Sequence, residues 1–425
     1  MYFIKKYKIY KYNKMNFSQN IDEMMKPFIA SFGKCPKPKN SPETLKKYKE
    51  VLIALYQVIY EAHQHVFHQA CFKSQVVAIR PAEGTIKRPD IYNGRYFPQQ
   101  IQKYISDNEK YQLIFSCQNV GKREINIIFT IFSEEDKNNT EKYVSYANAM
   151  YMWLYICAKY ATKNCSQTLD IYLYQTPFTK NLPENMTTIL GPEHVNTAFT
   201  YACVPRGQMI IFRDEEWFKV FLHETFHSYG LDFTSHEETE LKKQMYTLFP
   251  INSDFDMYEA YTETWARIMN CALCGFNTLA NKKDKKAFIE NTTFCIEMER
   301  MFAIYQCNKM LGFMGLQYQD IYQSATRNNL YRENTHVFAY YVMTAIFLND
   351  YQGFLVWCQK HNTALLKFER TPPVFKAFVD YIESIYTCDT LIQNMEYMRD
   401  LYKRLYKNKK KIINTSRMSL VHTLG

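Results

Sequence analysis

The sequence has no long apolar segment of the kind that crosses a membrane. A spanning helix needs about 18 or more consecutive residues with few charges, and the longest apolar stretches, residues 52–60 and 150–158, are much shorter. The first 17 residues are basic and aromatic, without an apolar run followed by a small-residue cleavage site. We therefore expect neither a transmembrane helix nor an N-terminal export signal, and we expect residues 1–15 to be disordered.

The sequence also lacks a cysteine framework, although it contains 12 cysteines. Without regular spacing and without an export signal, these cysteines predict reduced thiols in a cytoplasmic protein. Cys271 and Cys274 form a C-x-x-C pattern, but they lie inside an expected helix and have no partner pair, which favours core packing. Internal repeats are absent as well, which argues against a solenoid or a propeller.

Charge of neither sign dominates, because 52 Lys and Arg face 42 Asp and Glu and leave a net charge of +10. Positive charge is densest in residues 399–411, which continue an amphipathic run over residues 391–405. We expect the apolar face of this run to dock and its basic end to stay solvated. Contact of the basic tail with nucleic acid or an acidic surface is the alternative, which the lack of any known nucleic-acid-binding module disfavours.

One stretch, His223-Glu224-Thr225-Phe226-His227, carries residues suited to metal chemistry. Two imidazoles four residues apart share one face of a helix and can bind one metal ion, with Glu224 beside them as a base for water. Such a pattern arises by chance in roughly one or two chains per hundred of this composition. The alternative is therefore that both histidines are ordinary helix residues.

The flanking residues predict that this motif lies in the middle of a helix of about four turns. Residues 206–213 alternate like a strand. Asp214 is then the expected N-cap, with Glu215 and Glu216 in the first turn. Gly230 fits a left-handed C-terminal cap.

A second expected helix, over residues 256–274, supplies candidates for a third ligand, which a catalytic zinc site needs beside an open position for water. Glu259 and Glu263 are four residues apart and share a face. One carboxylate could bind the metal while the other accepts the second ring N–H of a histidine. Asp256 and Glu259 also fit a capping box, in which case Glu263 would be the ligand.

Together the two helices resemble those of the gluzincin metallopeptidases, the thermolysin-like group. The resemblance rests on His223-Glu224-x-x-His227 and Glu259-Ala-x-Thr-Glu263-x-Trp-Ala, about a tenth of the chain. It implies one Zn²⁺ ion bound by His223, His227 and Glu259, with Glu224 as the catalytic base and Glu263 orienting a histidine. The chain departs from the family in a longer gap before Glu259 and in having Glu, not Asp, at position 263.

The residues after His227 do not complete the H-E-x-x-H-x-x-G-x-x-H pattern of the metzincins, another zinc family. Gly230 is present, but the last position is Phe233, which cannot bind a metal. Asp232 comes one residue too early for the variant that ends in Asp. We therefore interpret Gly230 as a helix stop.

A hairpin is expected just before the motif helix, from residues 195–204 and 206–213. In thermolysin-like enzymes an edge strand at this place carries Asn-Ala-aromatic and pairs with the substrate backbone; Asn196, Ala198 and Phe199 are similar. An exposed edge suits an extended peptide because its N–H and C=O groups are unpaired. A hairpin without a ligand role fits these residues as well.

The resemblance implies a zinc-dependent peptidase in which Glu224 takes a proton from a zinc-activated water that attacks the peptide carbonyl. The family usually adds a Tyr or His from its C-terminal part to stabilise the oxyanion. His336 and Tyr340, four residues apart in an expected helix that opens at Asn334 and Thr335, are the candidates. Core packing is the alternative for any single tyrosine in a chain with 35 of them.

The order of the expected elements favours an α+β chain on the zincin plan, a small twisted sheet with the motif helix followed by a mainly helical lobe. With 425 residues, 47% of them hydrophobic, such a chain can build a large core in two or three lobes. We expect a mainly helical region over residues 1–110, an α/β lobe over 111–240, and over 241–425 a helical lobe with the third ligand and the basic tail. The expected elements are helices at 44–72, 140–161, 256–274, 286–311, 335–348, 373–385 and 390–407, and strands at 125–132 and 168–174.

Two functions fit these observations. The first is an active zinc peptidase with a protein or peptide substrate, and the second is a zincin-like structural or binding protein without turnover, such as a virion component. The presence of Glu224 favours the first, because a scaffold has no use for the base. The Lys-, Asn-, Tyr- and Phe-rich composition resembles that of uncharacterised proteins of large DNA viruses, so the expected location is cytoplasmic or virion-associated.

Overall fold

The computed structural model describes residues 19–68, 73–78, 87–92, 94, 96–234, 239–323, 327–408 and 411–422. The expected disorder of residues 1–15 lies outside these ranges. Among the helices so described, none combines the length and the apolar character that a bilayer span requires. The chain is α+β, as the sequence predicts.

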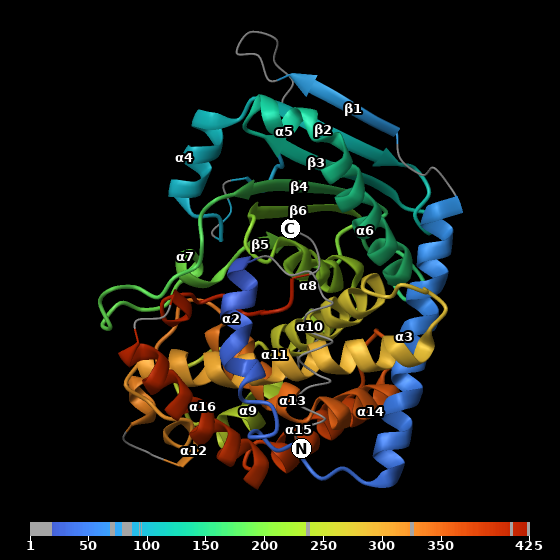
Figure 1. Ribbon diagram of the computed structural model, residues 1–425. Helices are drawn as coiled ribbons and strands as arrows, with labels where there is room; N and C mark the ends of the chain where they lie inside the picture. The colour runs from blue at the N-terminus through green and yellow to red at the C-terminus, as the bar shows by residue number, and fades with distance from the viewer. Residues whose placement is uncertain are drawn as a thin grey trace.

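A mixed six-stranded sheet forms the upper part of the molecule in Figure 1. Its order is β1-β2-β3-β4-β6-β5, so β5 is an edge strand. The central strands β3, β4 and β6 are parallel to one another, and the remaining pairs are antiparallel. The strands are β1 (Lys73–Ala78), β2 (Tyr111–Cys117), β3 (Glu124–Ile131), β4 (Thr168–Thr176), β5 (Ala198–Thr200) and β6 (Arg206–Arg213).

Both faces of the sheet are covered, which explains the nearly continuous apolar sequences of its central strands. Ile211 in β6 points into the main core, which it shares with α6 (Thr140–Ala158) and α8 (Trp217–Tyr229). Its neighbour Ile210 points to a second, smaller core beside α4 (Gln99–Asn108). The sheet thus carries α8, the helix with the two histidines, on the face that looks toward the helical part.

The helical part lies below the sheet in Figure 1, and α3 runs along the side of both parts. Helices α10 and α11 pack together beneath α8 (Figure 1). A π-helical turn over Phe338–Met343 leads into α13. The helices not yet given are α2 (Gln19–Ile29), α3 (Pro42–His68), α5 (Glu134–Asn138), α7 (Pro192–Val195), α9 (Thr239–Leu248), α10 (Met257–Asn277), α11 (Lys285–Phe313), α12 (Asp320–Gln323), α13 (Thr344–Asn349), α14 (Tyr351–His361), α15 (Pro372–Ile385) and α16 (Asp389–Lys407).

The three expected regions share one core. Leu55, Ile171 and Met298, one from each region, belong to the same cluster of buried side chains. Strand β1 adds the region before residue 110 to the sheet itself. The boundaries at residues 110 and 240 stay predictions.

The C-terminal segment does not end as a solvated tail, contrary to expectation. The apolar positions of α16 are buried while Lys403, Arg404 and Lys407 are exposed, but the chain then turns back into the molecule. Glu216 accepts hydrogen bonds from the backbone N–H groups of Met418 and Ser419. Carboxylates buried in the core give this segment hydrogen-bond partners that its own sequence does not reveal.

The expectation of reduced thiols is wrong for one pair, because Cys165 and Cys203 form a disulfide. Thr168 in β4 pairs with Arg206 in β6, and the two cysteines each lie three residues before these positions. Strand pairing therefore brings together residues separated by 38 positions in the sequence. The other cysteines that the structure describes, including Cys271 and Cys274, are free thiols.

Candidate metal centre

Three side chains from two helices converge at the face of α8 that looks toward α10. Nε2 of His223 lies 3.0 Å from Oε2 of Glu259 and 3.1 Å from Nε2 of His227. Nε2 of His227 is 3.4 Å from the same carboxylate oxygen. Ligand atoms of a tetrahedral zinc ion, each about 2.0–2.1 Å from the metal, lie about 3.3 Å from one another. The donor set, two imidazoles and one carboxylate, therefore fits a single divalent cation.

Helix α8 positions the two histidines somewhat differently from expectation. It begins at Trp217, and the residue before it is Glu216, with a left-handed φ of 62°. The expected N-cap at Asp214 is thus wrong, because the side chain of Glu216 is buried in an ion pair with Lys180. At the other end Gly230 has a φ of 63° and caps the helix as predicted.

A carboxylate contacts the Nδ1 atom of each histidine, on the opposite side of the ring from Nε2. Nδ1 of His223 lies 3.0 Å from Oε2 of Glu263, and Nδ1 of His227 contacts Oδ2 of Asp232. A carboxylate on the far nitrogen fixes the ring orientation and leaves Nε2 free to bind a metal. Glu263 contacts Nδ1 of His223, which is the position expected for a residue that orients a histidine ring.

This role of Asp232 was not predicted, because the sequence pattern suggested Asp232 only as a candidate metal ligand. It follows directly on the turn after α8, which returns the chain toward His227. A carboxylate two residues after a helix-ending glycine is the one signal that could have suggested this contact. The carboxylate also accepts hydrogen bonds from the backbone N–H and the hydroxyl of Thr234. Burial opposes ionisation, but His227 and these hydrogen bonds lower the pKa of Asp232.

Glu263 lies in a dense buried charge cluster. Lys219 Nζ is 2.8 Å from Oε1 of Glu263, and Nε of Arg267 approaches the same oxygen at 2.8 Å. Burial would raise the pKa of this carboxyl, but the two cations and the bond to His223 hold it well below its usual range. Glu263 is therefore a charged acceptor for the His223 ring.

Glu224 lies beside the three converging side chains and is not one of them. Its side chain is nearly buried and borders a small cavity together with His223. Burial raises the pKa of this carboxyl above its ordinary value. A raised pKa makes the carboxylate of Glu224 a stronger base than that of a solvated glutamate.

The capping-box alternative for Glu259 is not observed. The side chain of Asp256 makes no cap hydrogen bond and instead lies 2.9 Å from Nδ1 of His336. Glu259 points to the histidines, and Glu263 contacts Nδ1 of His223, not Nε2. The geometry thus places Glu259, and not Glu263, with the two Nε2 atoms.

The two oxyanion candidates both lie close to Glu259. The hydroxyl of Tyr340, in the π-helical turn, donates a hydrogen bond of 3.1 Å to Glu259 Oε2. Nε2 of His336 is 4.0 Å from Oε1 of the same residue. Burial opposes protonation of His336, but the hydrogen bond to Asp256 and the charge of Glu259 raise its pKa to about 9. Both side chains are donors within reach of the site.

Of the expected strand at residues 195–204, only Ala198–Thr200 form a strand, β5, at the edge of the sheet, and Asn196 instead ends the short helix α7. Asn196 and Ala198 line the same small cavity as Glu224. The side chain amide of Asn196 accepts a hydrogen bond from the hydroxyl of Thr335, which joins this edge to the segment that carries His336. Phe199 belongs to the second core on the far face of the sheet, so its side chain lies away from the metal centre.

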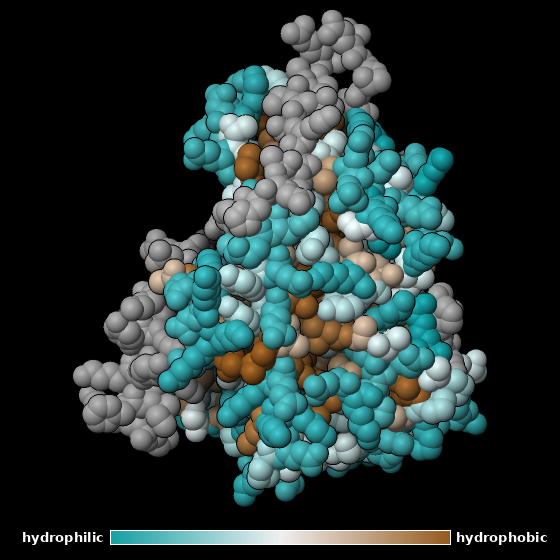
Figure 2. Space-filling model, turned by 90° about the vertical axis from the view of Figure 1, so that its right-hand side faces the viewer, coloured by the Kyte–Doolittle hydropathy of each residue, from teal (hydrophilic) through white to brown (hydrophobic). Residues whose placement is uncertain are grey.

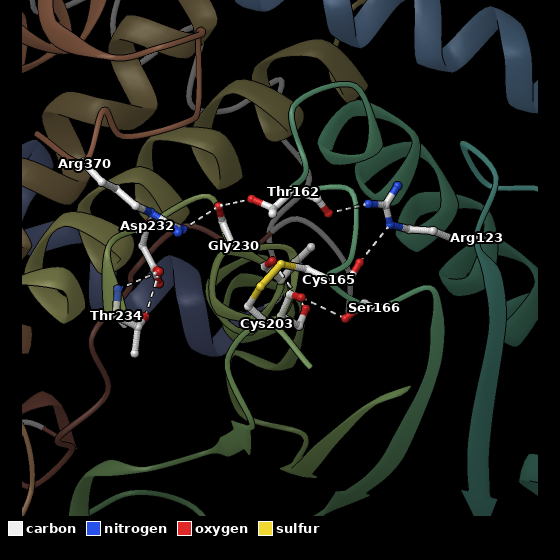
Figure 3. The surroundings of a disulfide bond; sticks show 11 residues. Arg123, Thr162, Cys165, Ser166, Cys203, Gly230, Asp232, Thr234 and Arg370 are labelled. Carbon is white, nitrogen blue, oxygen red and sulfur yellow. Dashed lines mark hydrogen bonds between the residues drawn. A yellow bond between two sulfur atoms is a disulfide. The ribbon is translucent and has the colours of Figure 1, made fainter. Parts of the chain in front are cut away.

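The disulfide lies at the C-terminal end of α8, where helix carbonyls lack partners within the helix. Figure 3 shows its surroundings. The backbone N–H of Cys203 donates to the carbonyl of His227 at 3.0 Å, and the hydroxyl of Ser166 donates to that of Ser228 at 2.8 Å. Thr162 and Arg370 donate to the carbonyl of Gly230. The segments joined by the disulfide thus hold the last turn of the helix that carries His223 and His227.

A larger cavity, of about 570 Å³, lies apart from this centre between α3, α6 and the end of α10. Its lining includes Phe218 and Leu273 but none of the residues described above. Figure 2 shows the side of the molecule along which α3 runs, where apolar side chains appear in patches among hydrophilic ones.

Comparison with models of protein families, with characterised proteins and with solved structures finds no match to this chain.

Proposed function

We propose that the chain is a zinc metallopeptidase with a zincin-like fold, in which His223, His227 and Glu259 bind the cation and Glu224 is the general base. The observation that carries the proposal is the convergence of these three ligand atoms next to an intact, nearly buried Glu224. Catalytic zinc sites have three protein ligands and an open position for a water molecule, whereas structural zinc sites usually have four protein ligands.

The other groups of the centre support the same function. Glu263 and Asp232 orient the two imidazoles. A bound Zn²⁺ ion would supply Lewis acidity toward water and toward the peptide carbonyl. Glu224 would accept the proton of the attacking water and return it to the leaving amine.

Tyr340 and His336 would stabilise the oxyanion after movements of their side chains, since both now contact Glu259 or Asp256. The outer edge of β5, with which none of the described strands pairs, would hold an extended peptide backbone. A protein or peptide substrate is therefore proposed, and no nucleic-acid role is assigned to the basic face of α16.

The proposal is tested by metal content and peptide cleavage of the wild-type protein and two variants. Glu224→Gln should keep about one zinc ion per chain and lose cleavage by about 100-fold or more, because it removes a general base and leaves the ligands in place. Glu259→Ala should lose the metal. Stoichiometric zinc without cleavage of a broad peptide library by the wild-type protein would instead favour a structural or binding protein on a zincin-like fold.

A further inference from the structure

The residues that line the small cavity beside Glu224 can favour one type of substrate side chain over others. It is bordered by His223 and Glu224 on one side and by the segment leading into β5, with Asn196 and Ala198, on the other. Because Ala198 belongs both to the cavity wall and to the edge strand β5, a peptide that pairs with β5 would run beside the cavity. A side chain next to the scissile bond is thus the substrate group that can enter it.

The cavity is small. Its volume is about 20 Å³, which is room for about one water molecule. Val195, Val220 and Met418 close it with apolar walls. A leucine or phenylalanine side chain would require these buried residues to move, and well-packed cores resist such insertions.

One residue of the cavity lining carries a polar group without a partner among the described residues. Thr197, which lines it, is 3% exposed, and its hydroxyl has no hydrogen-bond partner among the described residues. A buried hydroxyl that stays unpaired is costly, so a ligand that hydrogen-bonds to it is favoured over an apolar one.

The charges around the cavity argue against an acidic ligand. Lys180 is ion-paired with Glu216, and Lys219 is ion-paired with Glu263. Glu263 also pairs with Arg267, so neither lysine is left to pair with a carboxylate that enters the cavity. A buried aspartate side chain would therefore lack a lysine partner, whereas a neutral hydroxyl needs none.

We propose that the cavity receives the side chain of one residue flanking the scissile bond and selects serine, with the hydroxyl of Thr197 as its hydrogen-bond partner. This inference rests on the proposed peptidase function and adds a specificity determinant to it. The serine hydroxyl would take the place that one water molecule can fill, so no buried apolar residue has to move. Alanine fits the space but leaves Thr197 unpaired.

The test uses the zinc-loaded protein and peptides in which each flanking position is varied in turn among Gly, Ala, Ser, Asp, Leu and Phe. At one of the two flanking positions, we expect kcat/KM of the Ser peptide to exceed that of the Leu and Asp peptides by about tenfold or more. At the same position it should exceed kcat/KM of the Ala peptide by about fivefold. In Thr197→Val, which keeps the shape of the side chain, the Ser-to-Ala ratio should fall toward one. Thr292→Val is the matched control, because Thr292 in α11 is also buried with an unpartnered hydroxyl but does not line the cavity.

Binding of the same peptides to zinc-loaded Glu224→Gln separates this inference from the proposed function. If no peptide is cleaved by the wild-type protein but Ser peptides bind this variant more tightly than Leu peptides, the peptidase proposal fails and the cavity assignment stands. A preference for Leu or Phe at both positions would overturn the assignment. An unchanged ratio of kcat/KM between the Ser and Ala peptides in folded Thr197→Val would overturn it as well. If that variant does not fold, the order of kcat/KM among the peptides with the wild-type protein decides alone.

Discussion

Asp232 accepts a hydrogen bond from Nδ1 of His227, on the opposite side of the ring from the nitrogen that faces Glu259. The ring is thereby fixed between two carboxylates, one from the turn after α8 and one from α10. Glu263 does the same for His223. The two imidazoles thus have equivalent supports, although those supports come from different parts of the chain.

We expect Asp232→Asn to weaken zinc binding by about tenfold, because a neutral amide holds the ring less firmly and makes it a weaker base. Competition with a chromophoric zinc chelator measures the change. Asp254→Asn is the control, since Asp254 is exposed and pairs only with the surface residue Lys242 among described residues. Equal zinc affinity of Asp232→Asn and the wild-type protein would show that this contact does not support the site.

Much of the fold could be predicted because its elements have strong sequence patterns. The expected helix at residues 286–311 is α11, over Lys285–Phe313, and the expected strand at 168–174 is β4, over Thr168–Thr176. Strands β1 and β2 were missed, as were α4, α9 and α14. These elements are short, and β2 lies between the next strand in the chain, β3, and the more distant β1, a pairing that single-sequence patterns do not reveal.

The candidate site could be predicted as far as local spacing determines it. Residues four apart on one helix must share a face, which gives His223 with His227 and Glu259 with Glu263. Asp232, Lys219 and the disulfide contacts depend on how separate segments meet. Asp214 was wrongly expected to cap α8: the helix begins at Trp217, and Glu216 before it makes a buried ion pair with Lys180, a partner distant in the sequence.

Replacement of Lys219 by Met should lower the free energy of unfolding by about 3 kcal/mol, because Glu263 would lose one of its two buried cations. Urea unfolding followed by far-ultraviolet circular dichroism measures the loss. Lys243→Met is the control, because Lys243 is exposed and its pair with Glu240 spans 3.8 Å at the surface. Its effect should stay within about 0.5 kcal/mol, and a similarly small effect of Lys219→Met would contradict the prediction.

Removal of the disulfide by Cys203→Ser should lower the free energy of unfolding by about 2–4 kcal/mol, since the unfolded chain regains a loop between residues 38 positions apart. The last turn of α8 should also open more readily, because the segment carrying Cys203 donates to the His227 carbonyl. Urea unfolding and amide hydrogen exchange of α8 test the two effects. Cys388→Ser, at a partly buried free thiol, should leave both unchanged; equal stabilities of all three proteins would refute the prediction.

Glu333 should make stability fall as the pH rises from about 4.5 to 7. Burial raises the pKa of its carboxyl from 4.5 to about 7, and the carboxyl accepts hydrogen bonds from the hydroxyl of Ser253 and the backbone N–H of Phe338. Because the folded pKa lies above the unfolded one, the unfolded chain releases this proton at lower pH and is favoured as the pH rises. Glu333→Gln, which cannot ionise, should gain about 1–2 kcal/mol relative to the wild-type protein between pH 5 and pH 8, a value reduced from the full shift because the residue is partly exposed.

Urea unfolding of both proteins at pH 5 and pH 8 measures this difference, with the exposed Glu240→Gln as the reference for general charge effects. If the stabilities of Glu333→Gln and the wild-type protein change in parallel between the two pH values, then Glu333 ionises in the folded protein as an ordinary carboxyl does. Suppose that the free energy of unfolding of Glu333→Gln rises relative to the wild-type protein toward pH 8, while that of Glu240→Gln does not. The loss of stability in the wild-type protein then comes from ionisation of Glu333 next to the start of the π-helical turn that carries Tyr340. That segment would then be less stable at pH 8 for a reason separate from any effect of pH on the proposed metal ligands, so the pH dependence of the proposed activity has to be measured together with that of folding.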